Sequence, residues 1–412
     1  MRFQVALLAV AAGSVAAQQT GADTLSPVSY VKGKAFDRLA VIWLENTDYD
    51  LAVGDREHLF PFCNRYPPVV QTLTDRFTAN LAWLANKGIT LSNYFAVTHP
   101  SEPNYIASHG GDYFGMNNDA VSTVDANVST IVDLLEDKGI AWGEYQEDMP
   151  YTGFEGKEWV NQVTGANAYV RKHNPAVIYG ANSERADRLG VMKNLTLFYD
   201  DLASGTLPQW MFITPNMTSD GHDTSVTVAG KWTRSFLEPL LTDTRFMNNT
   251  LVLITFDENS SYALTNRVLA ILLGDAIPAE LIGSTDSSFY NHYSEIATVS
   301  ANWDLYTLGR WDAGANVFSW VADKTGDVVR EWSDVSAPPL DSMFYNQSYD
   351  GVFNDRGSFP VYPSPNVEVE SPSGRTVLPA VKEKWAGSAN PDYYSSVLEV
   401  PDGLHPPNGY DV

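Results

Sequence analysis

The sequence predicts an α/β fold with a central, mostly parallel sheet flanked by helices on both faces. Apolar runs of strand length alternate with segments of helical spacing along most of the 412 residues. These runs are apolar at nearly every position, which is typical of strands that are buried on both faces. The clearest of them run directly into acidic residues, which places polar groups at the ends of buried strands.

The elements follow in chain order from these patterns. Two predicted helices, 78–87 and 129–138, stop at Gly88 and Gly139, and glycine is common just after a helix. The further helices are expected at 183–203, 229–242 and 294–307. The predicted strands are 39–44, 90–97, 140–145, 210–214, 251–256 and 267–273.

The two ends of the chain differ from its middle in composition. Arg2 precedes an apolar run that ends in small residues, so residues 1–17 are expected to be a secretory signal peptide. Residues 18–336 are expected to form one domain. Residues 337–412 are rich in Pro, Gly and Tyr and are expected to be either an extension that wraps it or a partly disordered tail. No later segment is apolar enough to predict a membrane span, so we expect a secreted, extracellular protein.

Charge and modification signals narrow the class of partner. The chain has 50 acidic against 26 basic residues and a net charge of −24, which argues against nucleic-acid binding. Cys63 is the only cysteine, so no intrachain disulfide can form, and we expect it to be a buried apolar residue. N-linked glycans are expected as partners, although Asn216 and Asn259 lie beside the candidate site motifs. The six glycosylation sequons begin at Asn127, Asn194, Asn216, Asn248, Asn259 and Asn346.

Acidic pairs follow two of the predicted strands directly. Glu45 and Asn46 come after strand 39–44, and Asp257 and Glu258 come after strand 251–256. Ligands of open α/β sheets bind at the carboxyl ends of the strands. The sequence therefore predicts one composite site to which both pairs contribute.

A serine follows the predicted strand 90–97 within the sequence THPSEPNY, which covers residues 98–105. We expect a helix to begin near Ser101, where unpaired backbone N–H groups and the helix dipole stabilise an anion. An ordinary N-cap serine is the alternative interpretation.

Two further polar clusters contain histidine. Asp220, His222 and Asp223 crowd into the segment NMTSDGHD after strand 210–214, and His292 opens a predicted helix. Each cluster alone is weak evidence, because a single His or Asp near a strand end is more often structural. Several such clusters at matching strand ends favour a catalytic site.

Together these motifs resemble the phosphoesterase family that contains secreted fungal acid phosphatases and bacterial phospholipase C enzymes. The resemblance covers most of residues 35–310. This family is similar in turn to the alkaline phosphatase superfamily, whose nucleophilic Ser or Thr stands two residues before a Pro-Asn pair. Ser101 stands in that position before Pro103 and Asn104. The resemblance implies an alkaline-phosphatase-like fold and a phosphoserine intermediate on Ser101.

The resemblance also implies one divalent metal ion held by Glu45, Asn46, Asp257 and Glu258. Such an ion activates the serine hydroxyl and neutralises phosphoryl oxygens. This ligand set is rich in oxygen and lacks histidine, which favours Mg, Ca or Mn while leaving Zn open.

An acid pH optimum follows as a hypothesis, because metal-bound carboxylates resist protonation whereas histidines become cationic. His99, His222 and His292 are then expected to bind phosphate, and one of them to protonate the leaving alcohol. Asp220 and Asp223 are placed with the substrate-binding groups.

Two weaker signals complete the substrate site. Lys172 and His173 resemble a cationic segment that recurs in the family, although a solvated loop is an equally good interpretation. Asn118, or its neighbour Asn117, resembles an amide that donates to a phosphate oxygen in related phosphodiesterases.

The sequence thus predicts a secreted, metal-dependent acid phosphatase that acts on small phosphate monoesters. A phospholipase C-like phosphodiesterase remains an alternative, since the same groups can attack a diester. An inactive secreted binding protein is the non-enzymatic alternative. A serine esterase of the α/β-hydrolase type is disfavoured, because the chain has no Gly-x-Ser-x-Gly sequence.

Overall fold

The computed structural model describes residues 21–54, 79–331, 348, 351–355, 362–387 and 394–399. The predicted signal peptide, Cys63 and Asn346 lie outside the described residues.

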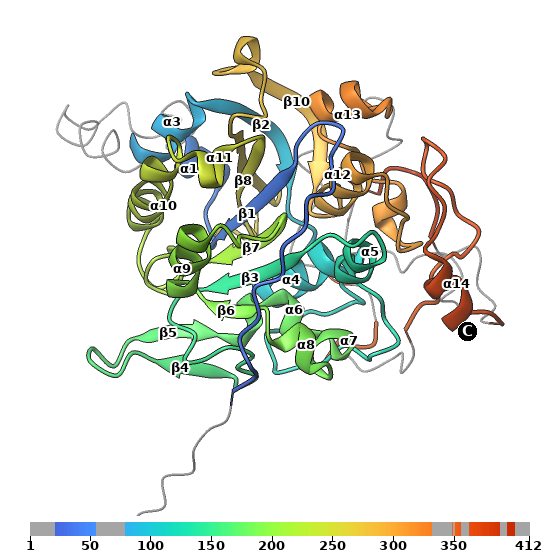
Figure 1. The fold of residues 1–412 in the computed structure, drawn as a ribbon, viewed down its shortest axis with the longest axis horizontal. Helices are drawn as coiled ribbons and strands as arrows, with labels where there is room; N and C mark the ends of the chain where they lie inside the picture. The colour runs from blue at the N-terminus through green and yellow to red at the C-terminus, as the bar shows by residue number, and fades with distance from the viewer. Residues whose placement is uncertain are drawn as a thin grey trace, which may run out of the picture.

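The fold is built on an eight-stranded sheet with the strand order β10-β2-β9-β8-β1-β7-β3-β6 (Figure 1). Strand β9 runs antiparallel to both of its neighbours, and the other pairs are parallel. The predicted α/β fold with a mostly parallel sheet is therefore confirmed. The strands are β1 (Arg38–Leu44), β2 (Gly88–Phe95), β3 (Trp142–Gln146), β6 (Met192–Asn194), β7 (Trp210–Thr214), β8 (Thr250–Phe256), β9 (Arg267–Leu273) and β10 (Thr285–Asn291). A separate hairpin pairs β4 (Glu158–Val160) with β5 (Asn167–Val170).

Helices cover both faces of the sheet. Figure 1 shows the sheet between one group made of α1, α3, α9, α10 and α11 and another that includes α4, α5, α12 and α13. The helices are α1 (Tyr49–Val53), α3 (Ala79–Ala85), α4 (Ser101–Gly110), α5 (Ile131–Asp137), α6 (Pro175–Ile178), α7 (Gly180–Ser183), α8 (Ala186–Leu189), α9 (Thr196–Ser204), α10 (Val226–Leu240), α11 (Thr244–Met247), α12 (Tyr293–Trp303), α13 (Ser319–Thr325) and α14 (Pro379–Lys384).

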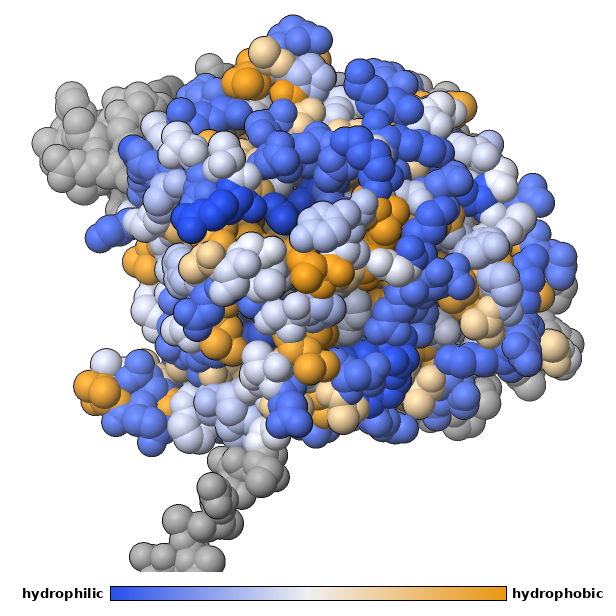
Figure 2. All heavy atoms as spheres, in the orientation of Figure 1, coloured by the Kyte–Doolittle hydropathy of each residue, from blue (hydrophilic) through white to orange (hydrophobic). Residues whose placement is uncertain are grey.

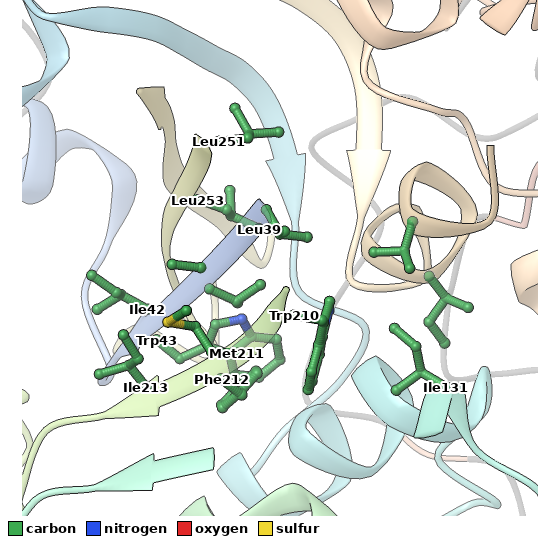
Figure 3. Packing of buried hydrophobic residues seen from close by; sticks show 14 of the residues in the cluster. Leu39, Ile42, Trp43, Ile131, Trp210, Met211, Phe212, Ile213, Leu251 and Leu253 are labelled. Carbon is green, nitrogen blue, oxygen red and sulfur yellow. The ribbon is translucent and has the colours of Figure 1, made fainter. Parts of the chain in front are cut away.

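The core lies between the sheet and these helices. Strands β1, β7 and β8 are buried at nearly every position, as their apolar sequences predict. Figure 3 shows Trp43 of β1 beside Trp210 and Phe212 of β7, and the Trp43 and Phe212 rings lie 5.5 Å apart between centroids. This packing fixes the strands whose carboxyl ends carry the acidic residues.

The predicted helix 183–203 is wrong. The chain instead forms α7, α8, the short strand β6 and then α9. The break falls at Gly190, where the extended N-terminal segment pairs through Leu25 N–H to the Gly190 carbonyl at 2.8 Å. A Cβ at Gly190 would lie 2.6 Å from the Asp23 carbonyl, so this contact requires glycine. Helical spacing did not reveal a contact with a segment 165 positions earlier in the chain.

The other helix boundaries need smaller corrections. Helix α12 stops at Trp303 rather than at 307, because Asp304 adopts a left-handed conformation with φ 56°. Gly139 follows α5 with φ 71°, as a glycine after a helix should. Gly88, by contrast, begins β2 instead of ending the preceding helix.

The described parts of the C-terminal region lie against the domain. Thr307 and Val377 form a parallel bridge, and Val377, Leu378 and Val381 are buried in the main core. The Tyr394 hydroxyl donates to the buried carboxylate of Asp112 at 2.6 Å.

The surface carries no large apolar area on the face that Figure 2 shows, where hydrophobic residues appear in small groups among hydrophilic ones. Among the described helices, none has the length and apolar character needed to cross a membrane.

Candidate active site

The parallel strands bring the predicted motifs to one edge of the sheet. Strands β1, β8 and β7 lie side by side and point the same way, and they lead into Glu45, Asp257 and the loop with Asp220. Strand β2 runs in the same direction and leads, through residues 96–100, into Ser101. The shared direction of these strands thus explains why the predicted residues lie at one edge of the sheet.

The centre of the site is a group of buried carboxylates. Glu45, Asp220 and Asp257 have at most traces of exposed surface. Burial raises the pKa of all three carboxyls, and the Asp257 charge raises the pKa of Glu45 and Asp220 further. The turn after β1 holds them together, because the Asn46 N–H donates to Asp257 Oδ1 at 3.1 Å and Glu45 N–H to the Asp220 carbonyl at 3.0 Å. Asn46 has φ 45°, a left-handed conformation that asparagine tolerates.

Ser101 is the first residue of α4, and its hydroxyl lies against the carboxylate group. The hydroxyl donates to Glu45 Oε2 at 3.2 Å. One turn further along the helix, the Tyr105 hydroxyl donates to Glu45 Oε1. The serine therefore combines a helix N-terminus with a nearby proton acceptor. Tyr105 belongs to the predicted motif, but its role as a partner of Glu45 was not predicted.

His173 lies inside the carboxylate group rather than on a solvated loop. Its Nε2 is 3.4 Å from Glu45 Oε1 and its Nδ1 is 3.6 Å from Asp220 Oδ2. Its ring stacks on Tyr105, with centroids 5.0 Å apart. Burial holds the pKa of His173 well below its usual range, so the imidazole is neutral.

Lys172 extends toward the same centre. Its Nζ lies 2.8 Å from Asp119 Oδ2. The charge of Asp119, together with those of Glu45 and Asp257, raises the pKa of Lys172 against the effect of burial. Lys172 is therefore cationic and partly exposed.

His222 stands at the mouth of the site. Its Nδ1 lies 2.8 Å from Asp223 Oδ1, and its side chain is 27% exposed. The His222 N–H donates to Asp220 Oδ1 at 2.7 Å, which fixes the loop against the carboxylate group. Its ring centroid is 5.9 Å from that of His173. The dense DGHD motif therefore joins an inner carboxylate to an outer histidine.

His99 and Glu258 form a buried pair next to this centre. His99 Nδ1 lies 2.6 Å from Glu258 Oε2, and the imidazole packs on the Tyr262 ring with centroids 4.0 Å apart. Burial lowers the pKa of His99 to about 3, which argues against the expected cationic role at acid pH. Burial and the Asp257 charge raise the pKa of Glu258.

His292 occupies a different place from the one predicted. Its Nε2 lies 2.7 Å from the backbone carbonyl of Asp257, and its Nδ1 lies 3.2 Å from the Tyr94 hydroxyl. Burial lowers the pKa of His292 to about 3. A buried ring whose two nitrogens both face protein oxygens argues against the expected cationic role. His292 instead positions Asp257.

Asn118 is also placed differently. Its amide donates to Asn117 Oδ1 and to the Phe353 carbonyl, both at 3.1 Å, and its Oδ1 accepts from Ala120 N–H. The next residue, Asp119, is the one at the site. Its Oδ1 accepts from the Glu102 N–H at the start of α4 at 3.0 Å. Asp119 was not predicted, because nothing in the sequence marks it except its position next to Asn118.

The donors at this centre fit a cation. Four buried atoms make no hydrogen bond: Asn46 Oδ1, Asp220 Oδ2, Asp257 Oδ2 and His173 Nε2. Potential ligand atoms of Glu45, His173 and Asp220 all lie within 4.8 Å of one another. A cation between buried carboxylates that repel each other would stabilise their ionised forms. The set includes an imidazole and Asp220, which differs from the predicted all-oxygen set with Glu258.

A pocket of about 150 Å³ opens beside the start of α4. Glu102, Asp119, Arg171 and Lys172 line it together with residues of the β4–β5 hairpin. Side chains of both charges line it, together with Val121, Val170 and the apolar stems of the longer side chains.

A serine at a helix N-terminus among buried carboxylates, at the carboxyl edge of a parallel sheet, is typical of an α/β ester hydrolase. The model of the phosphoesterase family matches residues 64–306. An acid phosphatase from Aspergillus fumigatus is 47% identical over 375 residues, which cover 90% of this chain and 77% of that protein. A phosphate-repressible acid phosphatase from Penicillium chrysogenum is 45% identical, with 95% and 91% covered. The chain therefore belongs to the phosphoesterase family, which confirms the resemblance.

A solved structure of a protein in the alkaline phosphatase superfamily from Vibrio parahaemolyticus is 12% identical to this chain. It has a TM-score of 0.41, with 79% of this chain and 76% of that chain covered.

Proposed function

We propose that this chain, an acid phosphatase of the phosphoesterase family, hydrolyses phosphate monoesters outside the cell through a phosphoserine on Ser101. The observation that carries the proposal is the position of Ser101. This residue begins α4, and its hydroxyl donates to Glu45 Oε2. The fungal relatives are named acid phosphatases, and they cover nearly the whole chain.

The chain's own residues account for the steps of the reaction. The Ser101 oxygen attacks phosphorus while its proton passes to Glu45 Oε2, and the bond from phosphorus to the alcohol oxygen breaks. His222 protonates the departing alkoxide, and Asp223 holds its Nδ1 so that Nε2 faces the substrate. Water then attacks phosphorus and gives a proton to His222, the bond from phosphorus to Ser101 Oγ breaks, and the proton on Glu45 returns to the serine as free phosphate leaves.

Positive charge for the phosphoryl group comes from two sources. Lys172 supplies a fixed cation near Glu45. Glu45, Asn46, Asp257 and either Glu258 or Asp220 would hold a divalent ion such as Mg, Ca, Mn or Zn, with His173 beside them. Bound there, the ion polarises the phosphoryl group and lowers the pKa of the serine hydroxyl.

The pocket beside Ser101 would take the alcohol part of the ester. Its small size favours small phosphate monoesters over lipids. A phosphodiesterase activity of the phospholipase C kind remains the alternative. Release of nitrophenol from nitrophenyl phosphate should be faster than from its bis-ester, and the reverse preference would favour the alternative.

Replacement of the nucleophile tests the proposal. Ser101→Ala should lower the turnover of nitrophenyl phosphate by about 10³-fold or more, because it removes the oxygen that forms the covalent intermediate. Ser108→Ala is the matched control, since it removes a buried hydroxyl from the same helix that bonds only within that helix. Acid quenching with labelled substrate should leave phosphate on Ser101. Retained turnover in Ser101→Ala would rule this mechanism out.

The metal site has its own test. Asp257→Ala should bring the divalent metal content of the purified protein from about one ion per chain toward zero, as elemental analysis measures. Asp119→Asn is the control, because Asp119 contacts Lys172 but not the carboxylate centre. Equal metal content in wild type and Asp257→Ala would refute this ligand set.

A further inference from the structure

A second pocket, of about 280 Å³, lies away from the proposed nucleophile, on the side of the molecule where β6, α9 and α10 meet (Figure 1). Its lining includes the aromatic side chains of Tyr199, Trp232 and Phe236, the carboxylates of Glu147 and Asp148, and the sequon residue Asn194, beside Leu195, Thr196 and Ser235. The proposed reaction uses none of these residues.

The aromatic wall offers ring faces at the surface. Trp232 stacks on Phe236 with centroids 5.3 Å apart and planes inclined by 10°, which fixes the orientation of the indole. Tyr199 is 52% exposed and packs edge-on against the buried Phe198. Rigid rings of this kind present an apolar face with a polar edge. The C–H faces of a sugar ring fit such a surface.

The acidic wall offers hydrogen-bond acceptors that the protein has already oriented. Glu147 accepts from Trp232 Nε1 at 3.1 Å and from the Asn216 N–H at 2.9 Å. Asp148 accepts from the Asn216 amide at 2.7 Å. Each ionised carboxylate has room for more donors. Sugar hydroxyls and an acetamido N–H are donors of the required kind.

Asn194 has one amide hydrogen to spare. Its Nδ2 donates to the Met149 carbonyl at 2.6 Å, and its Oδ1 accepts from the Thr196 N–H at 2.8 Å. Attachment of a sugar replaces one of the two hydrogens on Nδ2, so both existing hydrogen bonds can survive it. Asn259 differs, because it is buried and donates to the carbonyls of both Ser261 and Thr265.

We propose that Asn194 carries an N-linked glycan and that this pocket binds its innermost N-acetylglucosamine. The occupant is covalently attached to a residue of the pocket wall, so its effective concentration there is high even where each contact is weak. The volume lies just below the usual ligand-pocket range of roughly 300–1,000 Å³, which suits one or two sugar rings. The glycan would then tie β6 and α9 to α10.

The test is native deglycosylation of the full chain secreted from a yeast host. Endoglycosidase H cuts between the two innermost N-acetylglucosamines, and peptide mass spectrometry follows each sequon separately. On the folded protein, the Asn194 glycan should be cut at least about tenfold more slowly than in Tyr199→Ala, because the pocket shields it when the ring is present. Denatured protein should show equal rates for the two chains.

Matched variants separate the pocket from general effects. Tyr199→Phe keeps the ring and should keep the protection, and Tyr30→Ala removes a highly exposed tyrosine elsewhere and should not change the rate. Melting temperatures and phosphatase activity show that each variant is folded. An unmodified Asn194 would overturn the proposal. Equal native rates in wild type and Tyr199→Ala would overturn it as well, and neither result bears on the catalytic proposal.

Discussion

Among the four histidines of the candidate site, only His222 keeps a partly exposed side chain. His99, His173 and His292 are buried, and burial lowers the pKa of each. The proton donor in the proposed reaction must reach both solvent and the leaving group, which is why we place that role on His222.

His222→Asn tests that assignment by comparing two leaving groups. The variant should lose about 10²–10⁴-fold in turnover of an alkyl phosphate, whose alkoxide needs a proton. It should lose much less with nitrophenyl phosphate, since nitrophenolate leaves without protonation. Steady-state rates on both substrates with one preparation provide an internal control. An equal loss on the two would assign His222 to phosphate binding.

At the residue scale, the sequence motifs predicted which side chains gather at one edge of the sheet. They did not predict the hydrogen-bond partners of each side chain. The pairs after β1 and β8 could be placed because strand direction determines where their ends lie. The pKa of a histidine depends on burial and on partners from distant segments, such as Asp257 for His292 and Glu258 for His99. Those contacts bridge 35 and 159 positions in the chain, and local patterns carry no record of them.

At the scale of elements, strand β2 makes a close contact with β9 that its sequence did not predict. A Cβ on Gly88 would lie 1.9 Å from the Leu272 carbonyl of the neighbouring strand β9. Gly88 was predicted as a helix end, whereas the structure uses its missing side chain to let two strands pair closely.

Gly88→Ala should therefore destabilise the fold by about 2–4 kcal/mol, because the strands must separate or shift. Gly139→Ala is the matched control. Its added Cβ would lie in open space. The variant should therefore lose only the cost of a left-handed backbone at alanine, about 1 kcal/mol of the free energy of unfolding. Urea unfolding measures both free energies. A smaller loss for Gly88→Ala than for Gly139→Ala would contradict the role assigned to this contact.

The elements that sequence failed to predict share a physical cause. Strand β10 alternates between exposed and partly exposed residues along its first half, so it lacks the apolar run of the other strands. The short strand β6 is recognisable only through its pairing with β3. Strands that are apolar throughout were predicted well, because an uninterrupted apolar run itself indicates a buried strand.

For the whole molecule, the net negative charge and the buried carboxyls both favour greater stability of the fold at acid pH. The net charge of −24 repels itself at neutral pH, and acid reduces this repulsion. Several carboxyls are also buried inside the protein. Burial raises the pKa of Glu295 to about 8, although its Oε1 accepts from the Tyr94 hydroxyl at 2.7 Å and from Trp43 Nε1 at 3.0 Å. We therefore expect the fold to be most stable in acid.

The sign follows from proton binding. Between the ordinary pKa of a glutamate and about 8, Glu295 holds its proton in the folded chain and loses it in the unfolded chain. Unfolding then releases a proton, so the free energy of unfolding falls as the pH rises, by at most about 1.4 kcal/mol per pH unit for this group. The contribution is complete below the unfolded pKa and is lost as the pH approaches 8.

Glu295→Gln should flatten this dependence. The amide oxygen can still accept from Tyr94 and Trp43, so the variant should resemble the wild type at pH 5 and exceed its stability at pH 8. Glu280→Gln is the control, because it changes the net charge by the same amount at an exposed position. Denaturant unfolding at several pH values separates the two effects. If both variants flatten the curve equally, overall charge rather than the buried carboxyl sets the acid stability.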